Sequence, residues 1–153
     1  MHRSGVGGLR VRIQLVRSRG AIYAEKISGP GDVSRLLSHL RREDREQLVC
    51  IYLNATNVVL GVEMVSMGTV TASLVHPREC MKSAILLNAT GIIIVHNHPS
   101  GDATPSDEDI ATTRRMAEVC KLMGIPLLDH IIIGKDGFAS LKEKGVLTQS
   151  QTA

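Results

Sequence analysis

Two histidines, a serine and an aspartate are the residues of this chain whose types and spacing favour metal chemistry: His96, His98, Ser106 and Asp109. Imidazole nitrogens and carboxylate oxygens are ligands that zinc takes in proteins. Two histidines and one carboxylate leave a position open for water, as in catalytic zinc sites, whereas a structural zinc is closed by four protein ligands. The spacing therefore indicates a hydrolytic Zn²⁺ site held by His96, His98 and Asp109.

A short apolar run leads directly into the two histidines. Residues 91–95 are Gly-Ile-Ile-Ile-Val and Pro99 follows soon after, which predicts a buried strand. Alternate side chains of an extended chain share a face, so His96 and His98 are expected to point the same way and Asn97 to point away. Because proline disfavours helical backbone at the preceding residue, Pro99 supports this geometry. The two imidazoles should converge at the exit of the strand.

The carboxylate is expected to come from a following helix. Thr104 or Ser106 can cap it, Pro105 suits its first turn, and acidic residues suit its positive end. At about 100° per residue, Asp109 falls on the apolar stripe that includes Met116. A competing interpretation stays open, since Ser106 and Asp109 also have the spacing of a capping box, which starts many helices without binding metal.

The same residues resemble a known family. His-x-His-Pro at 96–99 followed by Ser-x-x-Asp at 106–109 is similar to the motif of the JAMM (JAB/MPN+) metalloprotease domain. The flanking segments 75–79 and 128–134 resemble the RadC family's version of that domain, and the resemblance covers about residues 33–147. It implies a three-layer α/β fold of the MPN/JAB (cytidine-deaminase-like) type, a mixed β-sheet with helices on both faces.

The expected chemistry is hydrolysis by metal-activated water. Zinc lowers the pKa of bound water from about 15.7 toward ~7 and polarises a carbonyl, and Ser106 is expected to donate to the oxyanion. A carboxylate must also carry the proton. The resemblance places it where the first helix meets the first core strand, which matches Glu46, with Glu63 as second choice and Glu79 less favoured. An ordinary solvated acid is the competing interpretation of Glu46.

Two further histidines have no spacing that ties them to the metal. His76 is expected to cap a helix that begins at Pro77, and His130 lies in an apolar strand beside Asp129. Both are kept as candidates for contact with the ligands rather than with the ion. Gly101 and the adjacent Asp102 are expected to shape the loop beneath the site.

Apolar periodicity and turn residues predict the remaining elements. The expected strands are residues 9–15, 21–24, 48–53, 58–68, 69–75, 91–95, 127–133 and 138–141, and the expected helices are residues 33–44, 77–87 and 106–123. Asp32 is the predicted cap of the first helix. The alternating segment 9–15 is expected at an edge, where it could pair two copies in a homodimer.

Length and composition favour one domain over residues 1–153, with a strand region and turn in 1–31 and the RadC-like core in 33–147. The chain has no Trp, one Phe and two Tyr, so the core must be aliphatic. Cys50, Cys80 and Cys120 are widely spaced in apolar segments, which favours core packing over a disulfide framework or a zinc clip.

Charge and hydropathy exclude some classes of protein. No apolar stretch approaches the ~20 residues of a membrane helix, and residues 1–19 lack the apolar segment of a signal peptide. A cytoplasmic protein without membrane contact is therefore expected. The net charge of +3 is modest, so the arginines are assigned to solvated surface, and nucleic-acid binding has little support.

The leading function is a zinc-dependent hydrolase of peptide or isopeptide bonds, acting on an unidentified peptide or protein substrate. The alternative is a non-catalytic or DNA-repair-associated RadC-like module that binds DNA or a protein partner. No helix-hairpin-helix region like that of full-length RadC is recognised here, which weakens the hypothesis of DNA binding. Base deamination is set aside, because its His-x-Glu and Pro-Cys-x-x-Cys signatures do not occur.

Overall fold

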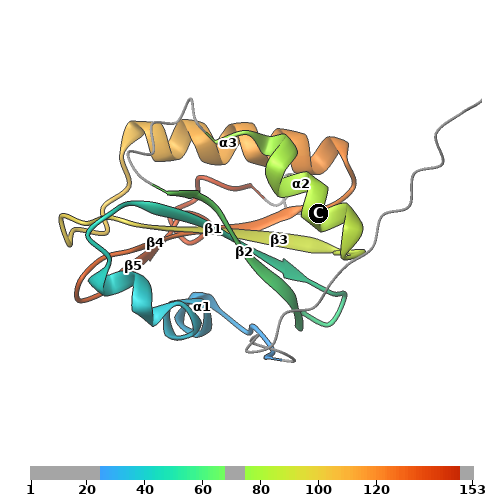
Figure 1. Cartoon of the computed structure of the whole chain (residues 1–153). Helices are drawn as coiled ribbons and strands as arrows, with labels where there is room; N and C mark the ends of the chain where they lie inside the picture. The colour runs from blue at the N-terminus through green and yellow to red at the C-terminus, as the bar shows by residue number, and fades with distance from the viewer. Residues whose placement is uncertain (1–24, 68–74, 149–153) are drawn as a thin grey trace, which may run out of the picture.

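A five-stranded mixed sheet forms the centre of the computed structural model, which describes residues 25–67 and 75–148 (Figure 1). Its strand order is β2-β1-β3-β4-β5. The strands are β1 (Gln47–Leu53), β2 (Val59–Met67), β3 (Gly91–Asn97), β4 (Leu127–Ile133) and β5 (Phe138–Ser140). Only the β3–β4 pair is parallel within this sheet. Parallel neighbours need a crossover, and a long helix between them supplies it.

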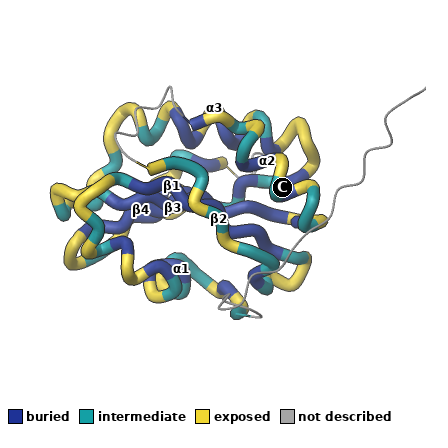
Figure 2. Tube along the Cα trace, viewed as in Figure 1, coloured by how far each residue is buried: buried dark blue, intermediate teal, exposed yellow. Residues whose placement is uncertain are grey.

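Helices cover both faces of the sheet, as predicted (Figure 1). One face carries α1 (Pro30–Leu36) and the 3₁₀ helix η1 (Ser38–Arg42). The opposite face carries α2 (Pro77–Leu86) and α3 (Asp107–Leu122). Every residue of β1 and β3 is buried, as expected of central strands covered on two sides (Figure 2). The three-layer mixed α/β architecture expected from the sequence is confirmed.

The sheet separates two aliphatic cores. On β1, alternate residues face opposite sides: Leu48, Cys50 and Tyr52 pack beneath α2 and α3, whereas Val49 and Ile51 pack beneath α1. The cysteines at 50, 80 and 120 are free thiols in the core beneath α2 and α3, as predicted. In the part of the chain that the structure describes, no helix is both long and apolar enough to cross a bilayer.

The first predicted helix, residues 33–44, is wrong in its bounds. The α-helix starts earlier, at Pro30, because proline is well suited to a first turn, and Gly29 occupies the cap position assigned to Asp32. Asp32 lies inside the first turn and accepts a hydrogen bond from Ser28 N at 2.8 Å. At Leu37 the backbone leaves α geometry and the chain continues as η1, which still ends near the predicted boundary.

Other boundaries agree closely with the sequence. The strand predicted at 127–133 is β4, and α3 begins after Ser106 and ends before Gly124, whose φ of +70° suits glycine. His76 does precede α2, but its side chain is exposed and makes no capping bond, so the predicted cap is wrong in that respect. The predicted strands at 9–15 and 21–24, the homodimer edge and most of 69–75 lie outside the described residues.

Candidate metal centre

Three elements meet at one end of the sheet and carry the candidate ligands. β3 ends at the two histidines, and α3 begins at Ser106, close to its exit. β1 runs antiparallel to β3 with Leu48 opposite His96, so the start of β1 lies beside the end of β3. Glu46 directly precedes that start. Strand pairing therefore brings together residues that are about 50 positions apart in the chain.

The predicted ligands converge. His96 Nε2 lies 3.0 Å from Asp109 Oδ1, and His98 Nε2 lies 3.3 Å from Asp109 Oδ2. The two Nε2 atoms are 2.9 Å apart. The side chains of His96, His98 and Asp109 are 3%, 17% and 12% exposed. These groups form a partly enclosed cluster rather than a solvated surface patch.

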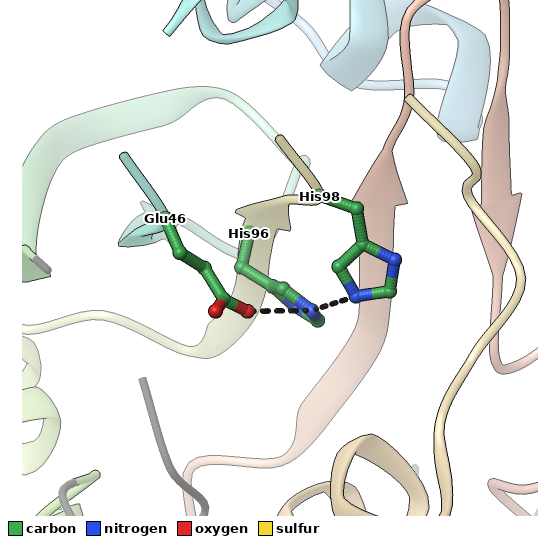
Figure 3. A group of neighbouring side chains, drawn as sticks. All are labelled: Glu46, His96 and His98. Atoms are coloured by element: carbon green, nitrogen blue, oxygen red, sulfur yellow. Dashed lines mark hydrogen bonds and ion pairs between the residues drawn. The ribbon is translucent and has the colours of Figure 1, made fainter. Parts of the chain in front are cut away.

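Glu46 belongs to the same cluster. Its Oε1 lies 3.7 Å from His96 Nε2, and one potential ligand atom from each of Glu46, His96 and His98 lies within 4.8 Å of the others (Figure 3). In Figure 3 the ring of His96 lies between the Glu46 carboxylate and the ring of His98. Asp109 is closer than Glu46 to both rings. Four donor groups, two imidazoles and two carboxylates, therefore gather around His96 Nε2, from which the other three lie 2.9 to 3.7 Å away.

Hydrogen bonds around the cluster indicate which atoms can bind a cation. His98 Nδ1 lies 2.8 Å from the carbonyl oxygen of Asp102, which can only accept, so Nδ1 carries a hydrogen. In the neutral ring this leaves the lone pair of Nε2 directed at the cluster. In the protonated ring Nε2 donates to Asp109 instead, and this hydrogen bond raises the pKa of His98. Burial alone would raise the pKa of Asp109, but hydrogen bonds from both imidazoles and the charge of His96 hold it far below its ordinary value.

The donor set fits a zinc ion. Neutral imidazole nitrogens and an ionised carboxylate are ordinary zinc ligands, and three of them with one open position match catalytic sites. The low pKa of Asp109 keeps its carboxylate ionised beside the two imidazoles. A divalent cation would replace the protons that these groups share.

The capping-box interpretation of Ser106 and Asp109 is confirmed. Ser106 N donates to Asp109 Oδ2 at 2.7 Å, and Asp109 N donates to Ser106 Oγ at 3.1 Å. The two interpretations are compatible because a carboxylate has about four acceptor positions. The capping box also orients the Asp109 carboxylate, since one oxygen is anchored to the backbone at the helix start.

Asn97 has a role that the sequence did not reveal. Its side chain, on a residue only 1% exposed, accepts from Gln47 N at 2.8 Å and donates to Arg45 O at 3.0 Å. These two backbone groups flank Glu46. The signal available in the sequence was that a buried amide must be hydrogen-bonded. Its partners became visible only once the pairing of β1 with β3 was known.

His130 lies against the site, but its neighbour Asp129 does not take part. His130 Nε2 is 2.7 Å from His96 Nδ1, and its ring is fully buried, which lowers the pKa of His130 well below the usual range. Asp129 instead accepts from Ser140 Oγ at 2.6 Å and from Lys142 N at 3.0 Å. Two histidines were predicted as candidates for contact with a metal ligand. His130 contacts His96, whereas the exposed His76 directly precedes α2.

The other glutamate considered as a base is engaged elsewhere. Glu63 lies within β2, opposite Cys50, and accepts a hydrogen bond from the Tyr52 hydroxyl at 2.9 Å. Glu79 pairs with Lys82 at 2.7 Å on α2. Glu46 is the glutamate that the structure places beside the two histidines.

The loop after β3 holds His98 in place, as expected for Gly101 and Asp102. His98 N donates to Ile133 O at 2.9 Å, and Lys135 N donates to Gly101 O at 2.9 Å. Gly101 has a φ of +90°, which favours glycine. The Asp102 carboxylate accepts from Thr104 and fixes the turn toward α3.

An open cleft gives access to the cluster. It has a volume of about 290 Å³ and is lined by Glu46, His98, Pro99, Ser100, Ser106, Glu108 and Asp109. A larger cavity of about 430 Å³ lies beside α1 on the opposite face and is lined by none of the four donor groups. Chemistry rather than size therefore selects the cleft as the candidate site.

Known proteins are similar to this chain over most of its length. The model of the family described as RadC-like JAB domain matches residues 27–146. A UPF0758 protein of Desulfitobacterium hafniense is 48% identical over 122 residues, which are 79% of this chain and 54% of that protein. A UPF0758 protein of Halalkalibacterium halodurans is 53% identical over 122 residues, 79% of this chain and 53% of that protein. The chain spans about half the length of these relatives.

Proposed function

Because the chain belongs to the RadC-like JAB domain family, we propose that it is a zinc-dependent hydrolase of the JAMM type that cleaves peptide or isopeptide bonds. His96, His98 and Asp109 would hold the ion, Glu46 would act as the general base and Ser106 would stabilise the oxyanion. The observation that carries the proposal is the convergence of two imidazoles and two carboxylates. Glu46 and Asp109 each lie within 4 Å of His96 Nε2, and Asp109 also lies within 4 Å of His98 Nε2.

Each of the chain's own groups has a defined task in this mechanism. When bound, zinc supplies Lewis acidity and lowers the pKa of a coordinated water. Glu46 takes the proton of the attacking water and delivers it to the leaving amine. Ser106 Oγ accepts from Asp109 N, so its own hydrogen can be donated to the developing oxyanion. Asn97 fixes the backbone on both sides of Glu46.

Glu46 is assigned as the base rather than as a third ligand because of its position. Asp109 contacts both imidazoles at 3.0 and 3.3 Å, whereas Glu46 approaches only His96, at 3.7 Å. Both carboxylates line the cleft, but the Glu46 side chain is 23% exposed against 12% for Asp109, so water and substrate reach Glu46 more readily. A base needs that access, and a ligand does not.

The metal content of purified variants tests the proposal. We expect one zinc per wild-type chain by native mass spectrometry, loss of zinc in the double variant His96→Ala/Asp109→Ala, and retained zinc without peptidase activity in Glu46→Gln. Glu63→Gln is the matched control, since Glu63 bonds Tyr52 away from the cluster, and it should keep both zinc and activity.

Two results would contradict the assignments. A folded double variant still loaded with stoichiometric zinc would remove the proposed site. A Glu46→Gln variant that loses zinc would make Glu46 a ligand instead of the base. Salt-sensitive binding of duplex DNA that survives zinc removal would favour the alternative, non-catalytic function.

A further inference from the structure

A chain of buried hydrogen bonds connects two of the proposed zinc ligands behind the site. His130 on β4 is 1% exposed, and its Nε2 lies 2.7 Å from His96 Nδ1. On its other side, His130 Nδ1 lies 2.6 Å from Thr113 Oγ1. Thr113 Oγ1 in turn lies 2.6 Å from the carbonyl oxygen of Asp109. The chain thus runs from the ring of His96 to the backbone of Asp109.

The direction of every bond follows from counting hydrogens. The Asp109 carbonyl can only accept, so Thr113 donates its single hydroxyl hydrogen there. Thr113 Oγ1 must then accept from His130 Nδ1–H. A neutral imidazole has one N–H, so His130 Nε2 is an acceptor and His96 Nδ1–H is the donor. When His96 is neutral, this leaves its Nε2 lone pair facing Asp109 Oδ1 at 3.0 Å and His98 Nε2 at 2.9 Å.

The opposite direction conflicts with the observed contacts. A hydrogen on His96 Nε2 would leave Nδ1 as an acceptor, and His130 would have to donate from Nε2. In its neutral form His130 would then need Thr113 to donate to Nδ1, which would leave the contact of 2.6 Å with the Asp109 carbonyl without a hydrogen. A doubly protonated His130 would place a charge between an imidazole and a hydroxyl in a buried position, which is costly.

We propose that His130 and Thr113 are positioning residues of the metal centre. They hold the ring of His96 through its Nδ1–H, so that Nε2 is directed at the position of the ion. The metal part of this inference rests on the proposed function, whereas the hydrogen bond from His96 Nδ1 to His130 is a property of the metal-free protein. Metal-binding histidines commonly donate their second N–H to a carboxylate, a carbonyl or water. Here another imidazole takes that place.

The second ligand shows the same preparation by a different group. His98 donates its Nδ1–H to the carbonyl of Asp102 at 2.8 Å, which leaves its Nε2 free as well. One imidazole is thus fixed by the loop and the other by the core. The chain through Thr113 also ties the first turns of α3, which carry Asp109, to the ring orientation of His96.

Four variants separate positioning from general stability. His130→Leu removes both hydrogen bonds, and His130→Gln keeps an amide oxygen that can accept from His96. Thr113→Val removes the hydroxyl at nearly constant volume. The control is Cys120→Ala, which truncates another fully buried side chain of α3 in the core beneath that helix.

The test uses two readouts on the full chain. Nitrogen-15 NMR of the metal-free protein should show His96 protonated on Nδ1 in wild type and a mixture of tautomers in His130→Leu. Competition with a chromophoric chelator should show zinc binding weakened about 10–100-fold in His130→Leu and Thr113→Val. His130→Gln should recover most of that loss, and Cys120→Ala should bind as wild type does although its melting temperature falls.

The inference is overturned if His96 of the metal-free wild type carries no hydrogen on Nδ1. It is equally overturned if a folded His130→Leu variant binds zinc with wild-type affinity. A wild-type chain that binds no zinc would instead refute the proposed function. In that case the NMR measurement still decides whether His130 sets the tautomer.

Discussion

Asn97 lies between the two histidines of the motif and connects β3 to the segment that carries Glu46. Replacement by alanine leaves Gln47 N and Arg45 O without their partner. An unpaired buried donor costs about 1–3 kcal/mol, so Asn97→Ala should lower the free energy of unfolding by that amount in urea titrations. Activity should fall more than zinc affinity, because Glu46 and not the ligands loses its support. A change below about 0.5 kcal/mol would contradict this role.

Ser106 combines two tasks that different substitutions can separate. Alanine removes both the cap of α3 and the hydroxyl, and loss of a cap costs about 0.5–2 kcal/mol. Glycine also removes the hydroxyl but costs only a few tenths of a kcal/mol as a cap. We expect Ser106→Ala to unfold at lower denaturant than Ser106→Gly, while both lose about 100-fold or more in turnover. Equal activity of wild type and Ser106→Gly would limit Ser106 to capping.

At the scale of elements, the loop after β3 crosses the end of β4 at very close range. A Cβ on Gly134 would collide with the carbonyl oxygen of Gly101 and lie 3.0 Å from Ala103 N. Gly134→Ala should therefore destabilise the protein by about 1–3 kcal/mol. It should also weaken zinc binding, because the loop carries the Asp102 carbonyl that orients His98.

The same turn offers a matched control for that prediction. A Cβ on Gly137 would meet no atom within 4 Å, so Gly137→Ala should change neither the unfolding midpoint nor zinc affinity appreciably. Thermal unfolding and chelator competition on both variants provide the comparison. Equal effects of the two substitutions would show that the crossing at Gly134 does not support the site.

Asp129 joins β4 to β5 and should make stability depend on pH. Burial raises the pKa of Asp129 above its ordinary value, although hydrogen bonds from Ser140 and Lys142 act in the opposite direction. A raised folded-state pKa contributes stability below the unfolded pKa of about 3.9, and this contribution is lost as pH rises through the folded value. Asp129→Asn keeps the shared acceptor oxygen, so its stability relative to wild type should increase from pH 4 toward neutrality.

Urea unfolding at several pH values tests this sign. Asp129→Ala is the contrast, because it leaves His130 N and Lys142 N without the oxygen that accepts from both. It should be less stable than wild type at every pH. A stability of Asp129→Asn relative to wild type that falls with rising pH would contradict the raised pKa of Asp129.

The elements differ in how far the sequence determined them. β4 was predicted within its bounds because an apolar run flanked by Pro126 and Gly134 has few alternatives. The bounds of the first helix were not predicted correctly. Its interruption at Leu37 depends on how the side chains of Leu37 and Leu40 both reach the core. Propensity alone does not report such tertiary packing.

The candidate site divides in the same way. Histidines two apart and a serine and aspartate three apart share one local segment, so regular strand and helix geometry was enough to bring them together. Asn97 and His130 act on partners 50 and 34 positions away. Those contacts follow from the order β1-β3-β4 in the sheet, which no local pattern contains.

At the scale of the whole molecule, zinc would connect β3 to α3 and lie beside the start of β1. Ligand that binds only the folded state stabilises it by about 2.7 kcal/mol at 100 times Kd. For a chain of this size that corresponds to a rise in Tm of roughly 5–10 °C. Removal of zinc with a chelator should reverse the shift. The double variant His96→Ala/Asp109→Ala should respond to neither zinc nor chelator.

The three core cysteines give the molecule an internal reporter of its own opening. Cys50, Cys80 and Cys120 each have 0% exposure, so a thiol reagent reaches them only through molecules that have transiently unfolded. They come from β1, α2 and α3, which all contribute to one core. Their alkylation kinetics therefore measure how often α2 and α3 separate from the sheet. A bound cation should slow the alkylation of all three cysteines together.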